Sequence, residues 1–291
     1  MKKPLFTGAC TALVTPFLDN KINSPMVEML LKRQLDAGIT AVVIAGTTGE
    51  APTLSDEEKL SLFSRSKKYV GEDCLIIAGT GSNNTAHAVT LSREAEETGA
   101  DALLVVSPYY NKASEEGLVA HFMAIAHSVS IPIILYNVPS RTGVDIPVSV
   151  YKRLCAIPNI VGVKEASSDI VKIARIRNAC GSNFSVWCGN DEQTVPTIAL
   201  GAQGVISVLS NVLPKETNAM ALAALDGDRD TAAHLQRQLL PLIDALFCEV
   251  NPIPAKQAMK LIGFDCGTCR LPLTPAKPDT ANRLKDALNI G

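Results

Sequence analysis

A unit of amphipathic helix, glycine and short apolar strand recurs along most of this chain, and the repetition leaves few folds open to it. The strands are apolar throughout instead of alternating, which is typical of parallel strands covered on both faces. The helical segments carry start and stop signals, such as the capping box Ser55-Asp-Glu-Glu58 and the helix-ending Gly71. We predict eight strands: Ala9–Thr15, Ala41–Ala45, Leu75–Ala78, Ala102–Ser107, Ile133–Tyr136, Ile160–Lys164, Phe184–Cys188 and Val205–Val208.

Eight such strands, spaced by about 30 residues, predict a (β/α)8 TIM barrel, an α/β fold in which helices surround a closed parallel sheet. The alternative is an open doubly wound sheet. Its usual dinucleotide fingerprint is missing, because Gly79-Thr-Gly81-Ser-Asn-Asn84 lacks the third glycine. The barrel is therefore the expected fold.

The strand pattern ceases after about Gly227, and only helical patterns follow it. These patterns cover Asp228–Cys248, Pro252–Ile262 and Pro278–Ile290. We therefore predict a catalytic barrel domain over residues 1–227 and a small C-terminal α-helical domain over residues 228–291.

The composition argues against nucleic-acid and membrane partners. Lys and Arg number 27 against 29 Asp and Glu, a net charge of -2, so a basic surface for nucleic acid is not expected. No apolar run reaches the roughly 20 residues that a membrane-spanning helix needs. The opening segment, MKKPLFTGAC, lacks the apolar core of a signal peptide, so we expect a cytoplasmic protein.

The eight cysteines predict neither disulfides nor a metal centre. Cys266 and Cys269 form the one suggestive pair, but none of the four histidines lies nearby at ligand spacing. A redox dithiol is expected at a helix N-terminus after a strand, whereas this pair lies in a loop before two prolines. We expect an incidental pair and no metal.

Catalytic groups of such a barrel gather where its strands end, at the C-terminal face. The strand Ile160–Lys164 is apolar until it ends in Lys164. An apolar environment disfavours the ammonium form of lysine, and the free amine can attack a carbonyl to form a Schiff base. Taken alone, the same pattern fits a strand that happens to stop at a charged residue.

Tyrosines lie at the ends of two neighbouring strands. Tyr136 ends the strand before that of Lys164, and because adjacent strands lie about 4.8 Å apart, the phenol and the amine can share one pocket. A tyrosine in that place can move protons to and from a carbinolamine. Tyr109 and Tyr110 follow the fourth strand. The alternative to a role in the site is packing at the barrel mouth or at a subunit interface.

Two further strand ends suit a carboxylate. After the second strand, Gly46-Thr47-Thr48-Gly49-Glu50 offers backbone amides and two hydroxyls, although by itself it is also an ordinary polar turn. Arg141 follows the fifth strand on a loop stiffened by Pro139 and Gly143, and arginine can grip a carboxylate with two parallel hydrogen bonds. Amine, phenol, turn and guanidinium together fit a 2-oxo acid substrate.

With these motifs the chain resembles the dihydrodipicolinate synthase/N-acetylneuraminate lyase family of class I aldolase-like enzymes. The resemblance runs from Gly8 almost to the C-terminus. The motifs that carry it are GTTGE at 46–50, SPYYNK at 107–112, LYNVPSRTG at 135–143, GVKEAS at 162–167, GVISV at 204–208 and NPIPAK at 251–256.

The resemblance implies that Lys164 forms a Schiff base with pyruvate and that Tyr136 is the proton donor and acceptor. It implies a relay of Thr47, Tyr136 and Tyr110, with Tyr110 reaching a neighbouring subunit of a homotetramer built as a dimer of dimers. The second substrate would be L-aspartate 4-semialdehyde, in the first committed step of lysine and diaminopimelate biosynthesis, without metal or organic cofactor. Substrate-binding residues would be Thr48 for the pyruvate carboxylate, Arg141 for the semialdehyde carboxylate, and the backbone at Gly189 and Ile206.

One departure from the family concerns feedback inhibition. Lysine-inhibited members resemble each other in an inter-subunit site, whose corresponding positions here are Asp56, Lys59 and His87, with Asn83 and Tyr109 retained. Lys59 would repel a cationic effector, and His87 cannot supply a full negative charge. We expect weak or no inhibition by L-lysine.

Three other functions compete with this interpretation. An aldolase for N-acetylneuraminate or 2-keto-3-deoxygluconate shares the lysine and tyrosine, but Arg141 and the threonine pair Thr47-Thr48 favour the synthase. A non-catalytic binding barrel would not need the complete polar set. A phosphate-binding isomerase would want a glycine-rich anion loop, and neither Gly189-Asn-Asp191 nor Ser210-Asn211 is adequate.

Overall fold

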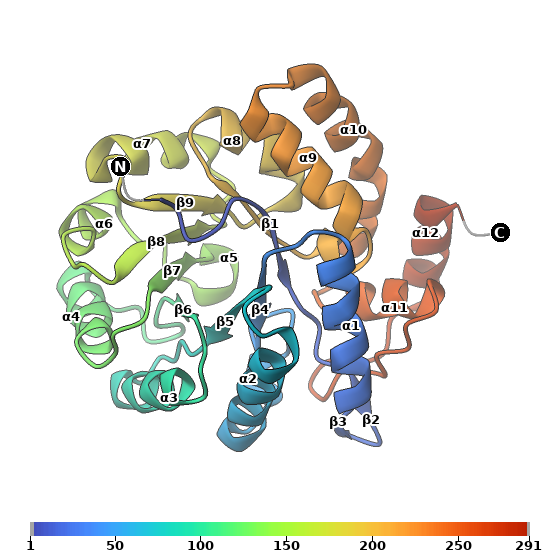
Figure 1. The fold of residues 1–291 in the computed structure, drawn as a ribbon, viewed down its shortest axis with the longest axis horizontal. Helices are drawn as coiled ribbons and strands as arrows, with labels where there is room; N and C mark the ends of the chain where they lie inside the picture. Colours follow the sequence, from blue (N-terminus) through green and yellow to red (C-terminus); the bar gives the residue numbers. More distant parts are fainter. Residues whose placement is uncertain (1–2, 290–291) are drawn as a thin grey trace.

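Eight parallel strands close into a barrel, with helices around them (Figure 1). The structure is a computed structural model that describes residues 3–289. This arrangement confirms the predicted (β/α)8 fold. The barrel strands are, in their order around the sheet, β1 (Gly8–Ala12), β10 (Gly204–Ser207), β9 (Ser185–Cys188), β8 (Ile160–Glu165), β7 (Ile133–Asn137), β6 (Ala102–Val106), β5 (Leu75–Gly79) and β4 (Ala41–Ile44).

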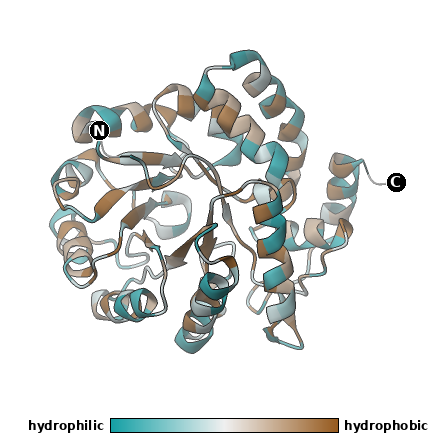
Figure 2. Ribbon diagram, in the orientation of Figure 1, coloured by the Kyte–Doolittle hydropathy of each residue, from teal (hydrophilic) through white to brown (hydrophobic). Residues whose placement is uncertain are grey.

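The strands are apolar throughout because each has two buried faces. In β4, Ala41 and Val43 belong to the cluster inside the barrel, whereas Val42 and Ile44 belong to the core between strands and helices. Figure 2 shows hydrophobic residues along the strands and on the helix faces turned toward them. The fully buried Trp187 lies in the interior cluster. The barrel is therefore a packed core, and open space is left at its rim.

Helices follow the strands as the periodicity predicted. Helix α2 begins with the expected capping box, in which Ser55 and Glu58 bond each other's backbone, and ends at Gly71. The surrounding helices are α1 (Ser24–Asp36), α2 (Asp56–Val70), α3 (Thr85–Glu97), α4 (Glu115–Ala126), α5 (Pro139–Thr142), α6 (Val148–Leu154), α7 (Ile170–Cys180), α8 (Thr194–Ala199) and α9 (Pro214–Asp226).

The first strand is shorter than predicted, because it ends at Ala12 and not at Thr15. Beyond it, side chains replace the neighbouring strands as hydrogen-bond partners. The Val14 amide donates to Asn211 Oδ1 at 3.0 Å, and Thr15 Oγ1 donates to the Gly49 carbonyl at 2.7 Å. The other seven strands end within one residue of the prediction.

A hairpin and a one-turn helix near the barrel rim were not predicted. A hairpin joins β2 (Phe17–Leu18) to β3 (Lys21–Ile22), and its two turn residues, Asp19 and Asn20, have φ of 50° and 60°. Such a turn of two left-handed residues is typical of tight hairpins. The expected loop around Arg141 is instead the one-turn helix α5, since Pro139 begins it and the left-handed Gly143 ends it.

The C-terminal segment is helical, as predicted. It contains α10 (Arg229–Leu246), α11 (Ile253–Leu261) and α12 (Pro278–Leu288), while the predicted end at Ile290 lies outside the described residues. Helix α10 packs against α9 and α8, and α12 packs against α10 and α11. Figure 1 shows α11 and α12 at one side of the barrel. The division into domains at residue 227 stays a prediction.

Across residues 3–289, every helix is too short or too polar to span a lipid bilayer.

Candidate active site

Lys164 and Tyr136 lie together at the C-terminal ends of two paired strands. They are direct partners in the register of β7 and β8. The Nζ atom of Lys164 lies 4.5 Å from the centre of the Tyr136 ring, and the two residues are only 5% and 7% exposed. The strand ends therefore bring the amine and the phenol to one place, as expected from the sequence.

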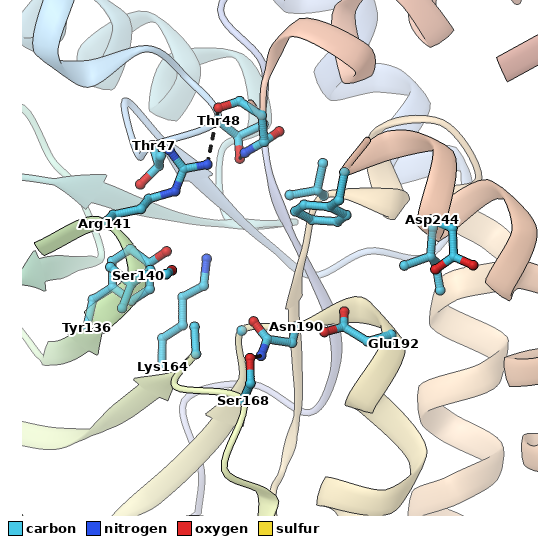
Figure 3. Close-up of a pocket in the computed structure, with 17 residues that line it drawn as sticks. Thr47, Thr48, Tyr136, Ser140, Arg141, Lys164, Ser168, Asn190, Glu192 and Asp244 are labelled. Carbon is cyan, nitrogen blue, oxygen red and sulfur yellow. Dashed lines mark hydrogen bonds between the residues drawn. The ribbon is translucent and has the colours of Figure 1, made fainter. Parts of the chain in front are cut away.

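A cavity of about 440 Å³ opens above this pair (Figure 3). Six of the eight residues singled out from the sequence line it: Thr47, Thr48, Tyr136, Arg141, Lys164 and Gly189. Ile206 lies instead in the packed barrel interior, fully buried in the same cluster as Tyr136. Tyr110 is 89% exposed at the surface of this single chain. Further lining residues are Val138, Ser140, Ala166, Ser168, Asn190, Glu192, Val208, Ile243, Asp244, Phe247 and Asn251.

The turn after β4 is held by its own backbone. The Glu50 amide donates to the Thr47 carbonyl at 3.0 Å, and the Ala51 amide donates to the Gly46 carbonyl at 3.1 Å. Glu50 adopts a left-handed conformation, with φ of 57°. This tight turn leaves the Thr48 side chain at the cavity, where it is 2% exposed.

Asn251, just before α11, joins the two residues expected to hold carboxylates. Its Nδ2 donates to Thr48 Oγ1 at 3.0 Å. Its backbone carbonyl accepts from Arg141 Nη2 at 3.3 Å, and Figure 3 marks this bond with a dashed line. Asn251 was not predicted as a site residue. Its only signal was its place at the start of the NPIPAK motif.

Gly189 makes room for the lysine side chain. A Cβ atom at this position would lie 2.6 Å from Ala166 Cβ and 3.1 Å from Lys164 Cε. The lack of a side chain after β9 therefore lets Lys164 extend into the cavity.

A buried polar network supports the two strand ends from behind. Glu165, next to Lys164, accepts hydrogen bonds from Asn137 Nδ2 at 2.8 Å and from Tyr151 Oη at 3.2 Å. Burial raises the pKa of Glu165, although Lys172, Asn137 and Ser167 oppose that shift. Burial together with the Glu165 carboxylate raises the pKa of the Tyr151 hydroxyl well above its ordinary value. These bonds fix the backbone that carries Lys164 and Tyr136.

Asp191, which was not predicted to have a role, closes the seam between β9 and β10, the neighbouring barrel strands with the fewest register pairs. Strands β9 and β10 share one register pair, Cys188 with Val205. Beyond that pair, Asp191 Oδ2 accepts from the amides of Val208 and Leu209 at 2.9 Å each. Burial raises the pKa of Asp191, opposed by the bonds it accepts and by the charge of Lys164. The seam in turn positions the cavity wall at Val208.

A second cavity of about 600 Å³ adjoins the first, and both are lined by Tyr136. It is lined by Asp56, Lys59 and His87, the three positions that are expected to weaken inhibition by L-lysine. Lys59 Nζ lies 3.1 Å from Asp56 Oδ1, and His87 Nε2 lies 2.7 Å from Asp56 Oδ2. Burial alone would raise the pKa of Asp56, but hydrogen bonds from His87 and Lys59 bring it below its ordinary value. The carboxylate is thus already paired within the chain.

Metal ligands do not gather within residues 3–289, where no three His, Cys, Asp or Glu side chains form a candidate site. Cys266 and Cys269 are free thiols, and burial raises the pKa of each to about 12. Such thiols are poor nucleophiles and poor metal ligands at neutral pH.

Comparisons with known proteins identify the family of this chain. The model of the dihydrodipicolinate synthetase family matches residues 5–290. The 4-hydroxy-tetrahydrodipicolinate synthase of Acetivibrio thermocellus is 47% identical over 288 residues, 99% of this chain and 98% of that protein. That of Kosmotoga olearia is 47% identical over 287 residues, 98% of each chain.

Solved structures show the same likeness. A dihydrodipicolinate synthase from Bacillus anthracis has a TM-score of 0.95 at 40% identity, covering 99% of both chains. The 4-hydroxy-tetrahydrodipicolinate synthase of Methylacidiphilum fumariolicum has a TM-score of 0.96 at 43% identity, covering 98% of this chain and 95% of the other. The expected lyase activity of a 4-hydroxy-tetrahydrodipicolinate synthase is thereby confirmed, and the chain belongs to the dihydrodipicolinate synthetase family.

Proposed function

We propose that the chain condenses pyruvate with L-aspartate 4-semialdehyde through a Schiff base on Lys164. The observation that carries this proposal is the position of Lys164 Nζ, 4.5 Å from the Tyr136 ring at the base of the cavity lined by Thr48 and Arg141. An amine, a phenol and two carboxylate-binding groups suit two substrates that are both carboxylic acids.

In the first half of the reaction, the Lys164 amine attacks the ketone carbon of pyruvate and forms a carbinolamine. Tyr136 supplies the proton with which the hydroxyl leaves as water, so that an iminium forms. The iminium withdraws electrons from the methyl group, which loses a proton and becomes an enamine carbon. Thr48 holds the pyruvate carboxylate with its hydroxyl during these steps.

In the second half, the enamine carbon attacks the aldehyde carbon of the semialdehyde, whose carboxylate is held by Arg141. The new C–C bond regenerates the iminium on Lys164, and the aldehyde oxygen takes up a proton. The amino group of the second substrate then attacks the iminium carbon and displaces the lysine amine. This exchange closes a six-membered ring and returns Lys164 to its starting state, without metal or organic cofactor.

The proton path is proposed to run from Tyr136 through Thr47 to Tyr110 of another subunit. Tyr110 is 89% exposed and has φ of 73°, so it projects from this chain instead of packing on it. A homotetramer arranged as a dimer of dimers would place such a tyrosine at a neighbouring site. Sedimentation velocity tests the assembly, and Tyr110→Phe should lower kcat only where subunits associate.

We place the reaction in the cytoplasm, at the first committed step of lysine and diaminopimelate biosynthesis. The eight cysteines are free thiols, which suits a reducing compartment. Fractionation of cells that produce the protein tests the location.

Borohydride trapping tests the proposed intermediate. Incubation with pyruvate and borohydride should attach a stable adduct to Lys164, which peptide mass mapping locates. Lys164→Arg keeps the charge but loses the nucleophile, so it should remain unmodified. An adduct on another lysine, or none in the wild type, would overturn the proposal.

A steady-state assay of the condensation tests the role of Arg141. Arg141→Ala should raise the KM for the semialdehyde by about tenfold or more, and the KM for pyruvate far less, since a charge-assisted hydrogen bond is lost from the second site alone. Equal effects on both constants would contradict this assignment.

A further inference from the structure

The wall of the active-site cavity contains a buried polar atom without a partner. Asn251 lines the cavity and is 5% exposed. Its Oδ1 accepts no hydrogen bond from any residue between 3 and 289. Buried polar side-chain atoms are paired in most proteins, and an exception inside a binding cavity points to a donor that enters with a ligand.

The bond to Thr48 determines which atom of the Asn251 amide is left without a partner. A threonine hydroxyl carries one hydrogen, which Thr48 must donate if it holds the pyruvate carboxylate. Its oxygen can then only accept from Asn251, and the amide NH2 group at 3.0 Å satisfies that need. The carbonyl oxygen Oδ1 therefore remains as an acceptor for something else.

The backbone of the same residue locates this acceptor beside the second carboxylate site. The Asn251 carbonyl binds Arg141 Nη2, so the guanidinium and the amide side chain belong to one part of the wall. In L-aspartate 4-semialdehyde, the amino group and the carboxylate are attached to the same carbon atom. A carboxylate bound by Arg141 thus brings its amino group close to Asn251.

We propose that Asn251 Oδ1 accepts a hydrogen bond from the amino group of the second substrate and so selects a semialdehyde that carries one. This inference rests on the proposed function. The acidic residues Glu192 and Asp244 also line the cavity, but Figure 3 places both across it from Arg141. A neutral amide oxygen also stabilises the ammonium form less than a carboxylate would, so the nitrogen loses its proton more readily before it displaces Lys164.

The test compares two semialdehydes on the intact enzyme. Succinate semialdehyde has the same chain, aldehyde and carboxylate as L-aspartate 4-semialdehyde but no amino group. Its inhibition constant, divided by the KM for L-aspartate 4-semialdehyde, measures the preference for the amino group. This ratio is determined for the wild type, for Asn251→Leu and for the control Thr48→Val, which removes the other partner of the amide.

Asn251→Leu should reduce the preference by about ten- to a hundredfold, the loss expected for a hydrogen bond to a charged group. Thr48→Val should raise the KM for pyruvate and keep the preference. Asn251→Asp retains an acceptor and should keep the preference too. An unchanged ratio in Asn251→Leu would overturn the inference. A wild-type enzyme with no preference for the amino group would overturn it too, and this second measurement needs no variant. If borohydride traps no pyruvate on the wild type, the proposed function fails instead.

Discussion

The Glu50–Lys256 ion pair ties the carboxylate-binding turn to the C-terminal helices, and Lys256→Met should destabilise the protein severely. The two charged groups lie 2.5 Å apart, with side chains 1% and 3% exposed. Lys256 Nζ also lies 4.2 Å from the centre of the Phe17 ring. Methionine fills a similar volume, so the main effect is to leave the Glu50 carboxylate buried without its cation.

Removing one partner of a buried ion pair typically costs about 3–5 kcal/mol, because the other charge keeps its desolvation penalty. For a chain of 291 residues, an unfolding entropy of about 2 cal/mol/K per residue converts this loss into a drop in Tm of roughly 5–8 °C. The matched control is Lys260→Met on the same helix. Its ion pair with Asp265 is about 60% exposed on both sides, so its loss should cost less than about 1 kcal/mol.

The assay is urea unfolding followed by the fluorescence of Trp187, the single tryptophan of the chain, which is fully buried. All variants are measured at one protein concentration, because association would add to apparent stability. The double variant Glu50→Gln with Lys256→Met removes both charges and should recover most of the loss. The reasoning is refuted if Lys256→Met unfolds like Lys260→Met, or if the double variant is less stable than Lys256→Met alone.

Three further predictions concern the barrel and the second cavity. Gly162→Ala should destabilise the protein by about 1–3 kcal/mol or more in the same assay, because the new Cβ would lie 2.3 Å from the Ser185 carbonyl oxygen; Gly117→Ala, whose Cβ has only ordinary contacts, should be neutral or slightly stabilising. Burial lowers the pKa of His121 to about 4 from 6.5, so the unfolded chain takes up a proton first and up to about 3 kcal/mol of stability is lost as the pH falls from 6.5 to 4. As the pH is lowered, the stability of His121→Gln should therefore fall less steeply than that of the wild type. The control His127→Gln changes an exposed histidine, and equal slopes in the two variants would contradict the prediction. L-lysine should inhibit weakly or not at all in a steady-state assay, because Asp56 is already paired with Lys59 and His87; a micromolar inhibition constant would contradict this.

The fold and the central pair of the site follow from local sequence patterns. Apolar strands and glycine-ended helices are determined by residues close in the chain, and eight repeats of that unit leave a closed parallel barrel as the simplest way to bury both faces of every strand. Lys164 and Tyr136 end consecutive strands, so their meeting required no knowledge of distant contacts. The end of β1 was predicted less well, because beyond it a side chain, that of Asn211, accepts the backbone hydrogen bond instead of a neighbouring strand.

Only the tertiary structure decided which distant residues complete the site. Asn251 donates a hydrogen bond to Thr48, which lies 203 positions earlier in the chain. Asp191 accepts the hydrogen bonds that close the seam between β9 and β10. No periodicity encodes such pairs, since an isolated Asn or Asp has the same local pattern whether it is solvated or buried. Their partners are determined by how α11 and the strand-end loops pack around the cavity, because a polar group buried there must find a hydrogen bond or bind a ligand.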